Sequence, residues 1–282
     1  MQLAGPDYPA PAKLNLFLHV VGRRADGYHL LQSAFALIDA ADRLRFAVRE
    51  DGGIRRVSDL PGVAAEADLV VRAARLLKEH TGTALGADIE VDKRLPLGGG
   101  VGGGSSDAAT TLIALNRLWG TGVSRPDLQS LGARLGADVP FFVFGRNAWV
   151  EGVGERLTPL DLPPAWYLVL VPPVAVPTRE IFAAPELTRD TEPLKMEDFS
   201  AHEQQGRFRN DLEAVVAARY PAVASHLAWL AARGGGRLTG SGACVFARFE
   251  DRVSAERVLR ELPGPMTGFV ARGLEQHPLR DL

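Results

Sequence analysis

Cysteine and long apolar runs are nearly absent from this 282-residue sequence, and each absence excludes a class of protein. The single cysteine, Cys244, cannot form a disulfide framework within one chain, and the six histidines do not combine with it at metal-ligand spacing. No stretch approaches the roughly 20 apolar residues of a membrane-spanning helix. The first twelve residues lack the pattern of a secretory signal or presequence. We therefore expect a soluble, cytoplasmic protein with no membrane partner.

An excess of positive charge is also missing, because 32 Lys and Arg residues face 34 Asp and Glu residues. Such a chain has no global field that attracts nucleic acid, so any anion must be bound locally. Lysine itself is scarce, and 28 of the 32 cationic residues are arginine. The four lysines are Lys13, Lys78, Lys93 and Lys195. Arginine cannot replace a compact ammonium at a tight site, so each lysine is a candidate functional residue, although Lys78 and Lys93 lie in segments typical of a surface.

The hydrophobic pattern predicts an α+β fold with two domains. Strands are expected at 14–21, 44–49, 87–91, 166–171, 243–249 and 268–272. Helices are expected at 68–80, 105–119, 124–136, 210–219, 221–233 and 251–262. A stop at Gly82 ends the first helix, and a capping box of Ser124 and Asp127 begins the third. Six prolines between 159 and 177 mark the predicted boundary between domains 1–158 and 159–282.

The segment 97–107 has six glycines in the seven positions 98–104, between a predicted strand and a predicted helix. Glycine at this density is typical of a loop whose amides converge on a ligand without a Cβ in the way. The free amides and positive dipole end of the following helix add to such a site, so the segment predicts anion binding. Ser105 and Ser106 are candidates to cap that helix, or to reach phosphate oxygens and a magnesium ion.

Two other interpretations of this loop remain. It can be a flexible linker, although a linker rarely runs directly into a capped amphipathic helix. Gly98, Gly100 and Gly103 also match the G-x-G-x-x-G pattern of a dinucleotide-dependent oxidoreductase, but no acidic residue ends a second strand at the required distance. A P-loop NTPase is excluded because no Gly-Lys-Ser/Thr follows the glycines, and the His-Arg-Asp and Asp-Phe-Gly elements of protein kinases are missing.

Three segments, in the right order, resemble the motifs of the galactokinase, homoserine kinase, mevalonate kinase and phosphomevalonate kinase (GHMP) superfamily. They are 11–16, 96–109 and 237–244. Within the superfamily, the segments 24–29, 135–141 and 151–155 are similar to the 4-diphosphocytidyl-2-C-methyl-D-erythritol kinases of the non-mevalonate isoprenoid route. The resemblance implies an N-terminal domain like part of ribosomal protein S5 and a C-terminal ferredoxin-like domain, with the active site between them.

The resemblance also implies a phosphate loop for ATP, with Mg²⁺ as the accompanying ion and no indication of the metal ligands. The implied ATP-binding residues are Pro96, Leu97, Gly98, Gly99, Gly100, Val101, Gly102, Gly103, Gly104, Ser105, Ser106 and Asp107. Asp138 is implied as the general base that accepts the proton of the attacking hydroxyl, and Lys13 as its ion-pair partner. By themselves, an Asp after Gly-Ala is usually a turn residue and a lysine before a strand is usually solvated.

The acceptor side is implied to be a cytidine pocket. The implied substrate-binding residues are Asn15, Tyr28, His29, Thr178, Phe182, Gly240 and Ser241. Asn15 shares a strand face with the candidate lysine and would hold the polyol, while Tyr28 and Phe182 would stack on cytosine and His29 would read its edge. Without the resemblance, the sequence favours the interpretation of Tyr28 and Phe182 as core residues, and a glycine turn before a strand usually needs no ligand.

These expectations describe one reaction, the ATP-dependent phosphorylation of the 2-hydroxyl of 4-diphosphocytidyl-2-C-methyl-D-erythritol, by direct in-line transfer. Two alternatives remain from the sequence alone. One is another GHMP kinase that acts on homoserine, mevalonate or a sugar, and the other is a non-catalytic nucleotide-binding sensor on the same fold. The expected partner is a small-molecule substrate, and the chain is expected to be a monomer or a homodimer.

Overall fold

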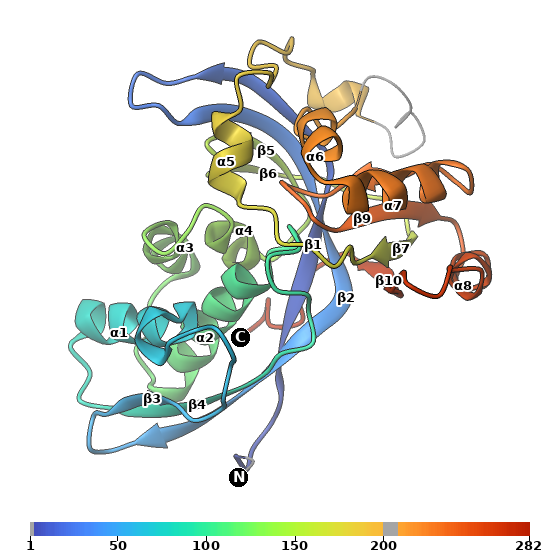
Figure 1. Ribbon diagram of the computed structural model, residues 1–282. Helices are drawn as coiled ribbons and strands as arrows, with labels where there is room; N and C mark the ends of the chain where they lie inside the picture. The colour runs from blue at the N-terminus through green and yellow to red at the C-terminus, as the bar shows by residue number, and fades with distance from the viewer. Residues whose placement is uncertain (1–2, 200–207) are drawn as a thin grey trace.

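Two long antiparallel strands run through the middle of the molecule in the computed structural model, which describes residues 3–199 and 208–282 (Figure 1). β1 (Tyr8–Arg23) and β2 (His29–Arg49) pair along nearly their whole length. The sequence predicted only part of each strand, because most of β1 is buried on both faces and apolar residues there do not alternate with polar ones.

Three further strands pair with β2, each with a different part of its length. They are β5 (Ala148–Gly152), β10 (Gly268–Leu274) and β4 (Gly86–Asp92). The sheet is completed by β3 (Ile54–Arg56), β6 (Arg156–Pro159), β7 (Trp166–Leu170), β8 (Arg237–Leu238) and β9 (Val245–Phe249). The described strands form one ten-stranded sheet, in which β10 joins β2 to β7.

Four helices gather beside the β3–β4 end of the hairpin, and four others belong to the second half of the chain (Figure 1). The first group is α1 (Leu69–Thr81), α2 (Gly103–Leu118), α3 (Arg125–Ala133) and α4 (Val139–Phe144). The second group is α5 (Thr178–Ala183), α6 (Glu213–Arg219), α7 (Pro221–Ala231) and α8 (Arg252–Arg260). Short 3₁₀ turns lie at Ala65–Ala67 and Met196–Asp198. The predicted α+β class is confirmed.

The local helix signals were accurate at several ends and wrong at others. Gly82 ends α1 in the left-handed conformation at φ 68°, and the Ser124 side chain accepts from the Asp127 amide at the start of α3, both as expected. However, α3 stops at Ala133, three residues before the predicted end. The short elements α4, α5, β5 and β6 were not predicted, because so few residues carry no clear period.

Buried side chains form a core under α1 to α4 and a second core around α5 to α8. The second core includes Leu18 and Val20, which belong to the far end of β1. The first hairpin therefore supports both halves of the molecule. The boundary between 1–158 and 159–282 stays a prediction; it falls at the end of β6. In the described part of the chain, no helix is long and apolar enough to cross a membrane.

Candidate active site

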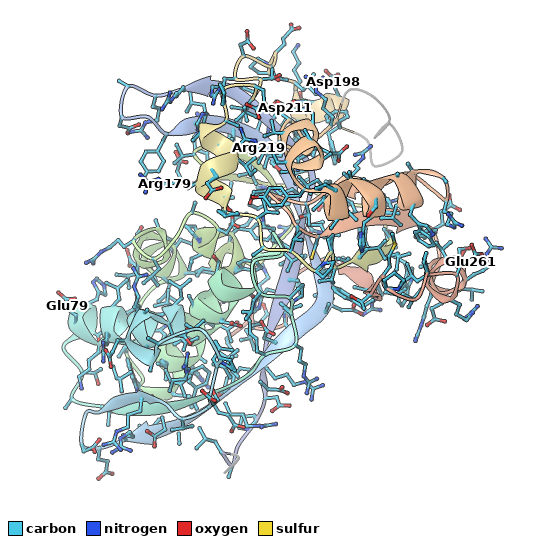
Figure 2. The ribbon with its side chains drawn as sticks, in the orientation of Figure 1. Glu79, Arg179, Asp198, Asp211, Arg219 and Glu261 are labelled. Carbon is cyan, nitrogen blue, oxygen red and sulfur yellow. The ribbon has the colours of Figure 1, made fainter. Side chains whose placement is uncertain are left out.

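One large cavity, of about 1010 Å³, lies where the glycine-rich loop, β1, the start of α4 and the start of α5 meet. Most of the side chains and loop residues predicted for the site line it. They are Lys13, Asn15, Tyr28, His29, the run 96–105, Asp138, Thr178, Phe182, Gly240 and Ser241. Ser106 and Asp107 are buried in α2 and do not line the described cavity. Arg179, which also lines it, is labelled on α5 in Figure 2.

The glycine-rich loop ends in a helix start with free amides. Gly98, Gly100 and Gly102 have φ of 66°, 75° and 74°, a region that side chains other than glycine rarely adopt. α2 begins directly after Gly102, and its first intrahelical bond runs from the Ser106 amide to the Gly102 carbonyl at 2.9 Å. The expected serine cap is therefore wrong, since Ser106 already lies within the first turn. The amides before it remain available to an anion.

The third predicted motif packs directly against this loop. A Cβ on Gly100 would overlap the carbonyl oxygen of Thr239 and lie 2.9 Å from that of Gly242. The Cys244 amide donates to the Gly99 carbonyl at 3.0 Å, which ties the two segments together. Cys244 itself is buried, and burial raises the pKa of its thiol to about 12, so it is an inert core residue as expected.

Lys13 and Asp138 meet at the centre of the cavity. Lys13 Nζ lies 3.3 Å from Asp138 Oδ2, donates to Asn15 Oδ1 at 2.5 Å, and sits 4.1 Å from the centre of the Phe35 ring. The lysine amide also donates to the Val101 carbonyl at 2.9 Å, so β1 is registered against the glycine-rich loop. The lysine side chain is buried, whereas that of Asp138 is 32% exposed at the start of α4. The carboxylate thus faces solvent while its position is held by a buried cation.

Lys93 is not the surface residue that its sequence context suggested. Its ammonium is held between Asp42 at 2.5 Å and Asp107 at 2.7 Å, beside Gly103 at the start of α2. Burial raises the pKa of Asp107 to about 7, although the neighbouring ammonium acts in the opposite direction. Burial also opposes the charge on Lys93, but the two carboxylates together raise its pKa. Sequence reasoning missed Asp42 and Lys93; the scarcity of lysine was the one signal that pointed there.

The other end of the cavity holds the residues predicted to bind a base. Tyr28 is 65% exposed at the tip of the β1–β2 hairpin. The ring centres of His29 and Phe182 are 5.2 Å apart with an interplanar angle of 34°. The hydroxyls of Thr178 and Ser241 are 2.6 Å apart, so they share a hydrogen bond across the start of α5. Tyr28, the His29–Phe182 ring pair and the two hydroxyl residues thus line the same cavity.

Comparisons with known proteins show the family to which the chain belongs. The model of the GHMP kinases N terminal domain matches residues 68–146, and that of the GHMP kinases C terminal matches residues 185–267. A protein of Aromatoleum aromaticum named 4-diphosphocytidyl-2-C-methyl-D-erythritol kinase is 64% identical, over 97% of this chain and 95% of its own. One of the same name from Thiobacillus denitrificans is 61% identical, over 97% of each chain. The chain belongs to the 4-diphosphocytidyl-2-C-methyl-D-erythritol kinase family.

Solved structures agree with the family and with the fold. A crystal structure of 4-(cytidine 5'-diphospho)-2C-methyl-D-erythritol kinase matches with a TM-score of 0.80 and 35% identity, over 95% of this chain and 99% of that one. A mevalonate kinase from Methanococcus jannaschii shares the fold, with a TM-score of 0.72 at 14% identity. The family and the two-part α+β fold implied by the sequence motifs are thereby confirmed. The roles of individual residues in the kinase stay predictions.

Proposed function

We propose that this kinase transfers the γ-phosphoryl group of ATP to the 2-hydroxyl of 4-diphosphocytidyl-2-C-methyl-D-erythritol, giving its 2-phosphate and ADP in non-mevalonate isoprenoid biosynthesis. Relatives of 55 to 64% identity carry the name of this kinase over nearly their full length, which favours this acceptor over homoserine, mevalonate or a sugar. The observation that carries the proposal is the Asp138 carboxylate, held 3.3 Å from a buried ammonium in the same cavity as the free amides of α2.

The arrangement supports direct transfer without a phosphoenzyme. Asp138 accepts the proton of the attacking hydroxyl as that oxygen bonds to the γ-phosphorus, and the bond from phosphorus to the β–γ bridging oxygen breaks to release ADP. Lys13 orients the carboxylate and stabilises the oxygen anion that develops beside it. Asn15, which donates to Ser33 Oγ at 3.1 Å and accepts from the lysine, positions the polyol. A sensor would not need this ion pair.

The triphosphate is proposed to sit on the first amides of α2, accompanied by Mg²⁺. The Ser105 hydroxyl, which lines the cavity, would hold such an ion, whereas Ser106 Oγ and Asp107 Oδ1 have no hydrogen-bond partner in the described part of the chain but are buried away from the cavity. The described residues hold no cluster of three or more His, Cys, Asp or Glu, so phosphate oxygens would complete the shell. When bound, the ion neutralises charge on the phosphates.

The cytidine end of the acceptor is proposed to lie between Tyr28 and Phe182, with His29 at the base edge. Stacking on an aromatic ring contributes about 1–3 kcal/mol per base and does not select among bases. Selection therefore falls to polar groups beside the rings. A cytoplasmic location, which suits an ATP-dependent enzyme with one buried free cysteine, and a monomeric or homodimeric state also stay predictions.

The test is a coupled ADP assay with 4-diphosphocytidyl-2-C-methyl-D-erythritol, mevalonate, homoserine and galactose as acceptors. We expect turnover only with the first. Asp138→Asn should lower kcat about 10²- to 10⁴-fold and leave ATP binding within about twofold, since it removes the base alone. Asp161→Asn, whose side chain is 99% exposed, is the matched control and should keep full activity. Unchanged kcat in the Asp138 variant would show that another group accepts the proton.

A further inference from the structure

One arginine joins the two sides of the proposed base pocket. Arg189 Nε donates to His29 Nε2 at 3.1 Å. Its two Nη groups donate to the carbonyls of Phe182 at 3.1 Å, Ala184 at 2.6 Å and Leu187 at 2.9 Å. These carbonyls lie at and just beyond the end of α5, where backbone acceptors lack partners within the helix. A planar guanidinium can satisfy them and reach the imidazole together, which a single ammonium cannot do.

This contact determines where His29 carries its proton. A guanidinium only donates, so Nε2 of His29 must be the unprotonated nitrogen that accepts. A neutral imidazole has one N–H group, which is therefore at Nδ1. Among the residues that the structure describes, no group hydrogen-bonds Nδ1. His29 lines the cavity, and no described residue competes with a ligand for this donor.

The surroundings also keep His29 neutral. Burial is the main cause that lowers its pKa, followed by the positive charges of Arg189 and Arg23. The carboxylate in the hairpin turn, Asp26, is 2.8 Å from Arg24 Nη2, so its charge is already paired. His29 thus remains uncharged near neutral pH, with one tautomer selected by its neighbour.

We infer that Arg189 is a specificity-determining residue of the base pocket, because it holds His29 as the tautomer that donates from Nδ1 to the base edge. The bond that separates the bases is to N3, which is an acceptor in cytosine but carries a hydrogen in uracil and would there meet the donor with another donor; O2 accepts in both bases. Arg189 acts through His29 and does not touch the reacting atoms, so it is a positioning residue. The inference rests on the proposed cytidine-linked acceptor.

The first experiment observes the imidazole directly and needs no ligand. In ¹⁵N-labelled protein, long-range ¹H–¹⁵N spectra should show Nδ1 protonated and Nε2 unprotonated from about pH 6 to 8. In Arg189→Met, that preference should disappear and the pKa of His29 should rise towards its ordinary value of 6.5. Arg219→Met is the matched control. Arg219, at the end of α6 (Figure 2), pairs at 2.6 Å with Glu186, which lies in the same segment after α5 as Arg189. It should leave the His29 signals unchanged.

The second experiment measures the dissociation constants of CDP and UDP. The unmodified enzyme should prefer CDP, and Arg189→Met should reduce that preference about tenfold, the value of one net hydrogen bond. In a His29→Ala background, the same substitution should change the ratio less than twofold. Arg189→Lys is a second variant in case the first does not fold, and it too should lose the preference.

The outcomes separate the inference from the function on which it rests. If CDP and UDP weaken equally in Arg189→Met while His29 keeps its tautomer, Arg189 only supports the end of α5, and the inference is overturned. If the unmodified enzyme binds CDP no better than UDP, the proposed acceptor fails as well. A tautomer with hydrogen on Nε2 in the unmodified enzyme would overturn the inference whatever the nucleotide affinities.

Discussion

Two glycines of the phosphate loop allow the packing of this loop to be tested with one matched pair of substitutions. Gly98 and Gly100 have nearly equal backbone angles, φ 66° and 75°, so alanine meets the same left-handed strain at both. They differ in their surroundings. A Cβ on Gly98 would meet no atom within 4 Å, whereas one on Gly100 would overlap the carbonyl oxygen of Thr239. The pair therefore separates the strain of the backbone from the contact between the two motifs.

The expected magnitudes follow from these surroundings. Alanine in the left-handed conformation destabilises the folded state by about 1–2 kcal/mol. Alanine also restricts the unfolded chain more than glycine does, which stabilises the folded state by about 0.4–1 kcal/mol. Gly98→Ala should therefore lower the free energy of unfolding by about 1 kcal/mol. Gly100→Ala adds the cost of overpacking against a backbone carbonyl, about 1–3 kcal/mol, for a total near 3 kcal/mol. For a chain of this size each kcal/mol lowers Tm by about 2 °C, so we expect losses of about 2 °C and 6 °C.

Differential scanning calorimetry and ATP titration should show opposite profiles for the two variants. The methyl group that Gly98→Ala adds would meet no protein atom within 4 Å, at a residue that lines the cavity, so this substitution should weaken ATP binding more than it lowers Tm. Gly100→Ala should mainly lower Tm, and kcat should fall as the amides at the start of α2 shift. Equal Tm values for both variants, within about 1 °C, would refute the claim that the segment at Thr239 fixes the position of the loop.

The remaining predictions concern charge and pH. Lys93→Met removes the ammonium between the carboxylates of Asp42 and Asp107 and should lower the free energy of unfolding, measured by urea denaturation, by about 3–5 kcal/mol. Adding Asp107→Asn should recover part of this loss. A Lys93→Met variant as stable as the unmodified enzyme would contradict the prediction. Burial lowers the pKa of His277 from 6.5 to about 3, so its protonation favours the unfolded chain. The contribution of His277 to the free energy of unfolding is therefore full above about pH 6.5 and is lost as the pH falls towards 3, by up to about 1.4 kcal/mol per pH unit. His277→Gln should flatten this slope in melts between pH 4 and 7; an unchanged slope would assign it to other groups.

Several local features of the fold and of the site were determined by the sequence itself. The run of glycines before α2, the cap at Ser124 and the stop at Gly82 depend on residues a few positions apart, and their chemistry is the same in any fold. The resemblance of three motifs to the GHMP superfamily also pointed to the family, and it implied that Lys13 and Asp138 share one site. Such patterns are local, so a single sequence carries them.

Other features required the tertiary structure. Lys93 and Asp42 lie 51 residues apart, and Arg189 and His29 lie 160 apart, yet each pair forms one contact. Nothing in the segments of Lys93, Asp42 and Arg189 distinguishes these residues from surface charges. The pairing of β2 with β4, in which Arg43 lies opposite Asp92, brings Lys93 beside Asp42. The segment after α5 is held against β1 by the bond from the Thr191 amide to the Val20 carbonyl, and this brings Arg189 to His29. Burial then converts ordinary charged side chains into fixed donors and acceptors, and burial is a property of the folded chain rather than of its sequence pattern.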